Sequence, residues 1–498
     1  MKILVAEPMA EAGLDLLRAQ SGWDVVVSNP KDYMPHLADA DALLVRSAVK
    51  VNADLLSKAP RLRVVGRAGV GVDNVDLDAA TRAGVLVMNT PGGNAVAVAE
   101  HTLGLMISMA RSIPQAVAST KGGQWEKKRF MGTELRGKTL GVLGLGSVGR
   151  EVVRRAQAFE MRVITSDQHV NRRVAEDLGV AIVSPGEFYA QSDYVSLHAA
   201  LTPETNGLLD ESAFEQMKKG VHIVNCARGE LIDSEALCKA VESGKVAGAA
   251  LDVFQKEPPP AGDPLLALDQ VLATPHIGGS TREAQEMVGI RIADQVLQYL
   301  RDGIAIHALN VPELTVDQYR TSVPYAALAE RLGSFAARIS NGRALRIGFI
   351  YRGRLAGQNT SLIRSAGLAG LLSTSLARKV NVVNAVQIAE ERAPLFRTPG
   401  RKAWADGFGT VGTGNGRKHH VSGRRAGSGQ ASPVTSRWHS LRGASRRPSD
   451  VPEERRRSGR DRLCRFDHRR KQHQHRLLLA RPSGCAASGC TAGGGCSD

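Results

Sequence analysis

The chain has 498 residues, enough for about three or four domains, and a formal net charge of +16. The charge is concentrated at one end, because residues 397–498 contain 22 Lys and Arg and 7 Asp and Glu, which leaves 43 basic and 42 acidic residues in 1–396. The near-neutral charge of residues 1–396 is not that of a protein that coats nucleic acid. The lack of a run of about 20 apolar residues excludes a membrane-spanning helix.

The first hundred residues alternate short β-branched runs with amphipathic stretches, a pattern typical of βαβ units and a parallel sheet. Strands are expected in KILVAE, DVVVS, DALLVR, LRVVGRAG and VLVMNT. The apolar periodicity of residues 95–111 then predicts a long buried helix.

A second series of strands follows this helix. Its segments are TLGVLGLG, RVITSD, YVSLHA, HIVNCA, VAGAALDV and VLATPH. After them, MVGIRIADQVLQYLRDG predicts a helix that ends at Gly303, a typical C-cap residue. The predicted fold class is α/β, with two doubly wound parallel-sheet (Rossmann-like) domains and a ligand cleft between them.

The first strand of the second series runs into a glycine-rich turn, GVLGLGSVGR. A G-x-G-x-x-G sequence that follows a strand and opens a helix is the fingerprint of dinucleotide binding. Gly144 permits the tight turn, Gly146 lets the backbone approach the pyrophosphate, and Gly149 allows close helix–strand packing. Asp167 ends the next strand, where a carboxylate accepts hydrogen bonds from the ribose and repels a 2′-phosphate. NAD is therefore the predicted cofactor, and no metal site is expected.

Polar residues follow the later strands of this series. They are His198, Cys226, Arg228, Asp252 and His276. Because the carboxyl ends of parallel strands meet at one edge of a sheet, we expect them to converge on the cofactor. Arg228 can bind a carboxylate in bidentate fashion, the imidazole of His276 can serve as a general base, and Glu257 can orient the imidazole. The set predicts hydride transfer between the cofactor and a hydroxy acid.

Several segments together resemble the D-2-hydroxyacid dehydrogenase superfamily, in particular its long phosphoglycerate-oxidising branch. They are GRAGVGVDN, NTPGGN, FMGTELRGKTLGVLGLG, HAALTPET, NCARGELID, GAALDVFQKEPP and TPHIGGSTREAQ. The resemblance covers about residues 1–396 and implies NAD-dependent oxidation of 3-phospho-D-glycerate to 3-phosphohydroxypyruvate, the entry step of L-serine biosynthesis. By similarity, Arg228 binds the substrate carboxylate, Glu257 is the orienting residue and His276 is the acid/base. A homodimer or homotetramer is expected.

The resemblance also implies a set of cofactor contacts. It comprises Val70, Gly144, Gly146, Ser147, Val148, Gly149, Asp167, His198, Ala199, Cys226, Ala227, Arg228, Asp252, His276, Gly278 and Gly279. Val70 and Ala199 stand where the superfamily usually has Thr, so each lacks a hydroxyl that could contact the cofactor.

Substrate contacts are expected from Arg228, from His276 and from the first series of elements. The residues there are Arg46, Ser47, Arg67 and Asn94. The two arginines stand at strand ends, and the asparagine begins the connecting helix, where free N–H groups suit an anion. The resemblance further suggests that the basic run 127–129 acts across a dimer interface.

We expect four parts in the chain. They are a discontinuous substrate-binding domain (1–98 plus 286–313), an NAD-binding Rossmann domain (99–285), a smaller α+β domain (314–396) and a basic, disordered tail (397–498). The third part resembles the intervening domain of the long branch, in which anions bind allosterically, so Arg352 and Arg354 are candidate ligands.

The long branch continues into a serine-sensing ACT domain, which the tail does not resemble. If the reading frame is moved forward by one nucleotide, KQHQH can encode N-N-I-N-I, a sequence common in those ACT domains. We interpret the tail as an out-of-frame reading of ACT coding sequence. A tail that binds RNA is the alternative, although it has few aromatic residues for base stacking.

Other functions remain open on the same fold. They are another D-2-hydroxyacid dehydrogenase, a 2-oxoglutarate reductase, and an NAD-sensing binding protein.

The only cysteines before residue 397 are Cys226 and Cys238, which give no disulfide framework and predict a cytoplasmic protein. Neither nucleic acid nor a membrane is expected as a partner.

Overall fold

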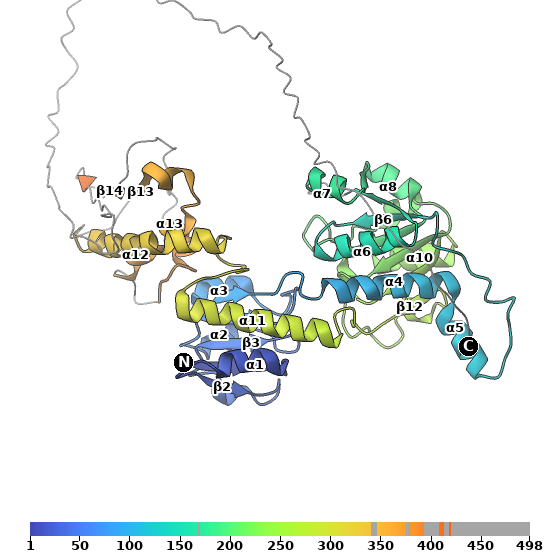
Figure 1. The fold of residues 1–498 in the computed structure, drawn as a ribbon, viewed down its shortest axis with the longest axis horizontal. Helices are drawn as coiled ribbons and strands as arrows, with labels where there is room; N and C mark the ends of the chain where they lie inside the picture. The colour runs from blue at the N-terminus through green and yellow to red at the C-terminus, as the bar shows by residue number, and fades with distance from the viewer. Residues whose placement is uncertain are drawn as a thin grey trace, which may run out of the picture. The chain divides into compact units, whose positions relative to one another are not determined.

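The computed structural model describes residues 1–166, 170–339, 346–374, 376, 379–392, 408–412 and 418–419. Its first sheet has five parallel strands in the order β2-β1-β3-β4-β5 (Figure 1). The strands are β1 Lys2–Val5, β2 Asp24–Val27, β3 Ala42–Val45, β4 Val64–Arg67 and β5 Leu86–Met88. All five lie in the segments predicted to be strands.

Both faces of the first sheet are packed. Ile3 and Val5 belong to one core cluster with residues of three helices, whereas Leu4 of the same strand belongs to a second cluster. This alternation follows from the two-residue period of a strand. The first face is covered by α1 (Glu11–Arg18) and α11 (Arg282–Asp302), and the second by α2 (Ala53–Ser57) and α3 (Leu77–Ala83).

Helix α11 returns to the first sheet from the far end of the second series of strands. It crosses α1 where two glycines meet, because a Cβ on Gly13 would lie 2.6 Å from the carbonyl oxygen of Gly289. The predicted end is confirmed, since Gly303 caps the helix with a φ of 71°. The helix begins before the predicted apolar run because the Thr281 side chain accepts a hydrogen bond from the Ala284 N–H and so caps the helix there.

The second sheet has seven parallel strands in the order β12-β11-β10-β9-β6-β7-β8. The strands are β6 Thr139–Leu143, β7 Arg162–Thr165, β8 Ala181–Ile182, β9 Tyr194–Leu197, β10 Val221–Asn225, β11 Val246–Leu251 and β12 Val271–Ala273. The strand order reverses between β6 and β9, and ligands of such sheets bind at this switch point. The six predicted strands are confirmed, and the additional β8 is only two residues long.

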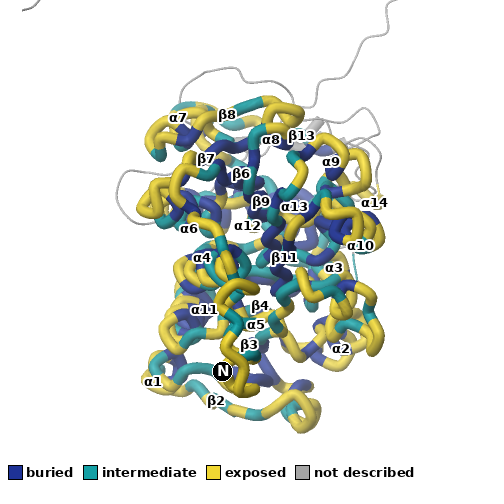
Figure 2. The backbone as a smooth tube through the Cα atoms, turned by 90° about the vertical axis from the view of Figure 1, so that its right-hand side faces the viewer, coloured by how far each residue is buried: buried dark blue, intermediate teal, exposed yellow. Residues whose placement is uncertain are grey.

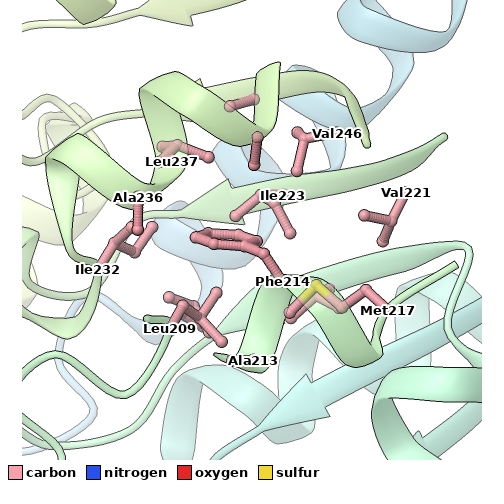
Figure 3. Close-up of a cluster of buried hydrophobic side chains, with 14 of the residues drawn as sticks. Leu209, Ala213, Phe214, Met217, Val221, Ile223, Ile232, Ala236, Leu237 and Val246 are labelled. Atoms are coloured by element: carbon pink, nitrogen blue, oxygen red, sulfur yellow. The ribbon is translucent and has the colours of Figure 1, made fainter. Parts of the chain in front are cut away.

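Helices cover this sheet on both faces. They are α4 Ala95–Arg111, α6 Ser147–Ala158, α7 Arg172–Asp177, α8 Pro185–Gln191, α9 Glu211–Gln216 and α10 Ser234–Glu242. The short helix α5, Ile113–Lys121, follows α4 and buries none of its residues. Helix α4 has the predicted bounds. On the face shown in Figure 3, Phe214 of α9 lies between Ile223 of β10 and the side chains of α10. The central strands are buried, whereas the edge strand β8 and the outer sides of the helices are exposed (Figure 2).

The third part contains helices and a small sheet, as the predicted α+β class requires. The helices are α12 Val316–Ile339, α13 Ser361–Ser373 and α14 Ala385–Arg392, and the sheet begins with β13 Arg346–Tyr351. Helices α12 and α13 pack with their backbones close together, because a Cβ on Gly333 or Gly370 would overlap a carbonyl oxygen of the other helix. The Asn381 amide donates a hydrogen bond to the Gly84 carbonyl oxygen at 2.7 Å.

Two short strands lie within the stretch predicted to be disordered. They are β14 Phe408–Gly412, which pairs antiparallel with β13, and β15 Lys418–His419, which pairs with β14. These pairings give two short pieces of the stretch a backbone partner that local composition does not reveal, while disorder of the tail as a whole stays a prediction. The rest of the tail, including the segment interpreted as out of frame, lies outside the described residues. Among the described helices, none is both long and apolar enough to span a bilayer.

Candidate active site

The glycine-rich turn lies between β6 and α6, at the switch point of the second sheet. Gly144 has a φ of 98°, and a Cβ there would lie 2.5 Å from the His198 carbonyl oxygen, so only glycine fits. Gly149 leaves room for the Gly144 carbonyl, whereas a Cβ on Gly146 would meet open space. Helix α6 begins at Ser147, and no side chain caps its first N–H groups in the described structure. The turn therefore fits a pyrophosphate at a helix N-terminus.

His198 follows β9 beside this turn. Its Nε2 lies 2.7 Å from the Ser196 hydroxyl oxygen, and burial lowers the pKa of the imidazole to about 4. The ring is therefore neutral near pH 7. Ala199 comes next in the chain and borders Gly144 through its backbone nitrogen. These residues pack against the glycine-rich turn.

Cys226 and Ala227 follow β10 in a tight turn. The Asn225 side chain holds this turn, because its Oδ1 accepts from the Ala227 N–H at 3.0 Å and its Nδ2 donates to the Arg228 carbonyl oxygen at 2.7 Å. Burial raises the pKa of the Cys226 thiol to about 12. The thiol therefore stays protonated near neutral pH and is no nucleophile.

His276 and Glu257 form a close pair. The His276 Nδ1 lies 2.7 Å from Glu257 Oε2, and Glu257 Oε1 accepts a hydrogen bond from the Phe254 N–H at 3.1 Å. The two side chains are 53% and 38% exposed, so solvent or a ligand can reach the imidazole. With Nδ1 engaged by the carboxylate, Nε2 is the ring nitrogen left for a proton transfer.

Asp252 fixes the loop that carries this histidine. It follows β11 and is 1% exposed, and its carboxylate accepts from the N–H groups of Ile277 and Gly278, both at 2.8 Å. The Thr274 hydroxyl donates to the same carboxylate at 2.6 Å, and His101 Nε2 of α4 lies 3.3 Å away. These contacts hold the pKa of Asp252 below its usual value against the opposing effect of burial. They stabilise His276 in its left-handed conformation, with a φ of 53°.

Arg228 reaches from the second sheet to the loop after β4. Its Nη1 donates to the Ala227 carbonyl oxygen at 2.7 Å, and its Nη2 lies 3.0 Å from Asp73 Oδ2. Arg67, at the end of β4, belongs to the same charged group, since burial and the Arg228 charge both lower its pKa. The structure thus brings Arg228 together with a cation that was predicted for the substrate site.

Arg46 and Ser47 lie in a loop after β3 that a buried carboxylate organises. Glu7 is 5% exposed and accepts from the N–H groups of Arg46 at 2.8 Å, Ala48 at 3.1 Å and Val49 at 3.0 Å. The arginine side chain also lines a cavity of about 500 Å³ with residues of α1 and α11. Ser47 is exposed on this loop.

The remaining predicted contacts lie on the connections around the two sheets. Asn94 is the N-cap of α4 and sits against Gly279, where a Cβ would come within 2.8 Å of its amide nitrogen. The Val70 carbonyl oxygen accepts from the Asn89 amide at 2.5 Å. Asp167 lies outside the described residues, so its predicted contact with the ribose stays a prediction.

Sequence reasoning missed several residues that hold the site together. Glu7, Asp73, Asn74, His101 and Asn225 all make the contacts of this region through side chains. Glu7 and Asn225 carried a usable signal, because each is a polar residue at the end of an apolar strand. The partners of Asp73 and His101 are more than 150 positions away along the chain, and no local pattern identifies them.

The second sheet and its glycine-rich turn define the class of protein. Residues 103–278 match the family model for the "D-isomer specific 2-hydroxyacid dehydrogenase, NAD binding domain". The chain is thus an NAD-dependent dehydrogenase of the 2-hydroxyacid type.

Two further comparisons narrow the class. Residues 322–399 match the "D-3-phosphoglycerate dehydrogenase intervening domain". The chain is 45% identical over 394 residues to a D-3-phosphoglycerate dehydrogenase of Methanocaldococcus jannaschii, covering 79% of this chain and 75% of the relative. It is 42% identical over 395 residues to the Bacillus subtilis protein of that name, with the same two shares. The chain belongs to the D-3-phosphoglycerate dehydrogenase family.

Solved structures resemble the two parallel sheets. The TT0316 protein from Thermus thermophilus is 35% identical with a TM-score of 0.56, covering 61% of this chain and 98% of that chain. An NAD-dependent formate dehydrogenase from Staphylococcus aureus in complex with NAD is 28% identical with a TM-score of 0.55, covering 63% and 100%. These matches confirm the predicted α/β fold class.

Proposed function

We propose that this chain catalyses the NAD-dependent oxidation of 3-phospho-D-glycerate to 3-phosphohydroxypyruvate, the first step of L-serine biosynthesis. The observation that carries the proposal is the 2.7 Å pair of His276 Nδ1 and Glu257 Oε2, which stands at the same edge of the second sheet as the glycine-rich turn. Membership of the D-3-phosphoglycerate dehydrogenase family supports the choice of substrate.

The glycine-rich turn fits NAD by its shape. Gly146 and the N-terminus of α6 would hold the pyrophosphate, and the turns after β9 and β10 would line the nucleotide. When bound, NAD accepts the hydride from the carbon that carries the substrate hydroxyl. Asp167 would select NAD over NADP through the ribose. Val70 and Ala199 contribute only backbone and apolar contacts there, since neither has a hydroxyl.

His276 is the proposed general base. Its Nε2 would take the proton of the substrate hydroxyl as that carbon is oxidised, and the proton later passes to water. Glu257 would offset the positive charge that the imidazole then carries, because its carboxylate lies against Nδ1. The backbone N–H of Phe254 fixes the carboxylate in that position. Asp252 holds the histidine loop and so keeps Nε2 directed to the site.

Arg228 is the proposed ligand of the substrate carboxylate. Its guanidinium can present parallel N–H groups to two carboxylate oxygens. The phosphate would be bound by cations and polar groups of the first sheet and by the start of α4. They are Arg46, Ser47, Arg67 and the helix N-terminus at Asn94. Because the substrate carries about three negative charges near neutral pH, this cationic edge suits it better than a hydroxy acid whose only charge is its carboxylate.

Glu257→Gln should lower kcat about 10- to 100-fold with little change in the KM for NAD, because a neutral amide stabilises the imidazolium less than a carboxylate at 2.7 Å does. Glu257→Asp, which keeps the charge on a shorter stem, should recover part of the loss. Steady-state rates of the three proteins at saturating NAD measure this effect. Equal kcat values would show that Glu257 does not act on His276 during turnover.

We propose the domain boundaries given by the sequence, namely 1–98 plus 286–313, 99–285 and 314–396. The packing of α11 on α1 supports the discontinuous first domain.

A homodimer or homotetramer formed through the cofactor domain is supported by Trp125 and Met131, whose exposures of 76% and 83% leave apolar surface beside the basic run 127–129. The free thiols of Cys226 and Cys238 are consistent with the reducing cytoplasm.

The test of the proposed function is NADH formation from 3-phosphoglycerate and NAD by the purified chain. D-lactate, D-glycerate and 2-hydroxyglutarate, supplied in parallel, test the other 2-hydroxyacid activities. Turnover of 3-phosphoglycerate with the highest kcat/KM is expected. NAD binding without turnover of any of these substrates would instead identify a sensor on this fold, and faster turnover of another acid would identify a different dehydrogenase.

A further inference from the structure

Asp73 places a carboxylate against the guanidinium that is proposed to bind the substrate. It lies in the loop after β4 of the first sheet, and its Oδ2 is 3.0 Å from Arg228 Nη2 at the edge of the second sheet. The proposed mechanism gives Asp73 no role. The pair nevertheless joins two segments that are more than 150 residues apart in the sequence.

The loop is shaped to admit this contact. A Cβ on Gly71 would overlap Arg228 Nη2 and would lie 2.8 Å from Asp73 Oδ2. The φ of Gly71 is not in the left-handed region, so the glycine is needed for space and not for its backbone conformation. The absence of a side chain at position 71 therefore leaves the room in which guanidinium and carboxylate meet.

The contact places a carboxylate beside the part of the guanidinium that a ligand would approach. Arg228 Nη1 already donates to the Ala227 carbonyl oxygen at 2.7 Å, and Asp73 Oδ2 lies 3.0 Å from Nη2 as an ion pair. A substrate carboxylate that approaches the guanidinium in bidentate fashion needs two parallel N–H groups. Asp73 is thus positioned as a competitor for part of the same cation.

The positive charges around Arg228 explain why a carboxylate of the protein would lie beside it. Arg67 is half-buried near Arg228, and the two positive charges repel each other, while the Asp73 charge attracts both. Without an anionic ligand, the cationic group needs a counter-charge. The Asp73 side chain is 65% exposed and that of Arg228 is 28% exposed, so the carboxylate can leave for water at little desolvation penalty.

We infer that Asp73 is a displaceable stand-in for the substrate carboxylate: it neutralises Arg228 in the free enzyme and yields that position when the substrate binds. The inference rests on the proposed function of Arg228. It makes Asp73 a determinant of substrate affinity that acts against binding, unlike the cations around it. The ground-state complex with a trianionic substrate is weakened, and release of the equally anionic product is eased.

The test is the affinity of the NADH-bound chain for 3-phosphoglycerate, measured by NADH fluorescence for the wild type, Asp73→Asn and Asp78→Asn. Asp78 is exposed in the first turn of α3 and serves as a control for the loss of one negative charge nearby. Asp73→Asn should bind about two- to fivefold more tightly than the wild type, the size expected for an exposed ion pair. The control should differ little, and the gain should shrink in high salt.

The inference holds only if Asp73→Asn binds 3-phosphoglycerate more tightly than the wild type does. Weaker binding by Asp73→Asn would mean that Asp73 positions Arg228 for the substrate, and unchanged binding would mean that the pair has no role; either result overturns the proposal. Oxalate, titrated in the same way, separates this inference from the proposed function. Tighter oxalate binding by Asp73→Asn would support the stand-in role even in a chain that does not oxidise 3-phosphoglycerate.

Discussion

His276→Asn should lower the kcat for 3-phosphoglycerate oxidation about 10²- to 10⁴-fold, the range associated with loss of a general base. Asparagine keeps a polar side chain of moderate size but cannot accept the hydroxyl proton near neutral pH. Because Asp252 holds the loop through the backbone N–H groups of Ile277 and Gly278, the substitution leaves the loop in place. The KM for the substrate should therefore change much less than kcat.

Two measurements separate this chemical effect from misfolding. The melting temperature and the NADH affinity of His276→Asn should stay close to those of the wild type, since the side chain is 53% exposed and packs little. Added imidazole should restore part of the lost rate by occupying the vacated space. A variant that retains more than a tenth of the wild-type kcat would exclude His276 as the base.

Arg228→Lys should raise the KM for 3-phosphoglycerate about 10- to 100-fold, because a single ammonium cannot bind two carboxylate oxygens in parallel. A lost hydrogen bond between charged groups of about 1.5–3 kcal/mol corresponds to this range. The positive charge is kept, so a loss of affinity would be due to geometry and not to net charge. The KM for NAD should stay within about threefold of the wild-type value, a change smaller than the loss of one such hydrogen bond would cause.

Arg150→Lys is a matched control for this prediction. Arg150 lies on α6 in the same domain, and its guanidinium contacts the Gly146 carbonyl oxygen on the exposed side of the helix. Its replacement should leave the KM for 3-phosphoglycerate unchanged. If Arg228→Lys behaves like this control, the substrate carboxylate binds elsewhere and the proposed orientation of the substrate is wrong.

The sequence predicted the sheets well because their signals are local. Each β-branched run between turn residues became a strand, and the signal of the glycine-rich turn, Gly144, Gly146 and Gly149, lies within six positions of the chain. Strand β8 escaped prediction because two residues, Ala181 and Ile182, are too few for a periodic signal. Helix α11 begins earlier than predicted because its start depends on capping and not on apolar periodicity.

The site was predictable only in part, for a physical reason. Arg228, Glu257 and His276 each stand in a short motif at the end of a strand, so their convergence follows from the topology of a parallel sheet. The contact of Arg228 with Asp73 depends instead on how two sheets approach each other. Likewise, β14 pairs with β13 across a predicted boundary, which composition cannot reveal. Contacts between segments that are distant along the chain could not be predicted from the sequence.

A crystal structure of the chain with NADH and 3-phosphoglycerate would show how the substrate binds. We expect His276 Nε2 to lie within hydrogen-bond distance of the substrate hydroxyl and Arg228 to bind the substrate carboxylate in place of Asp73. The phosphate should lie among Arg46, Arg67 and the N-terminus of α4. A substrate bound with its hydroxyl away from His276, or with its carboxylate on another cation, would contradict the proposed mechanism.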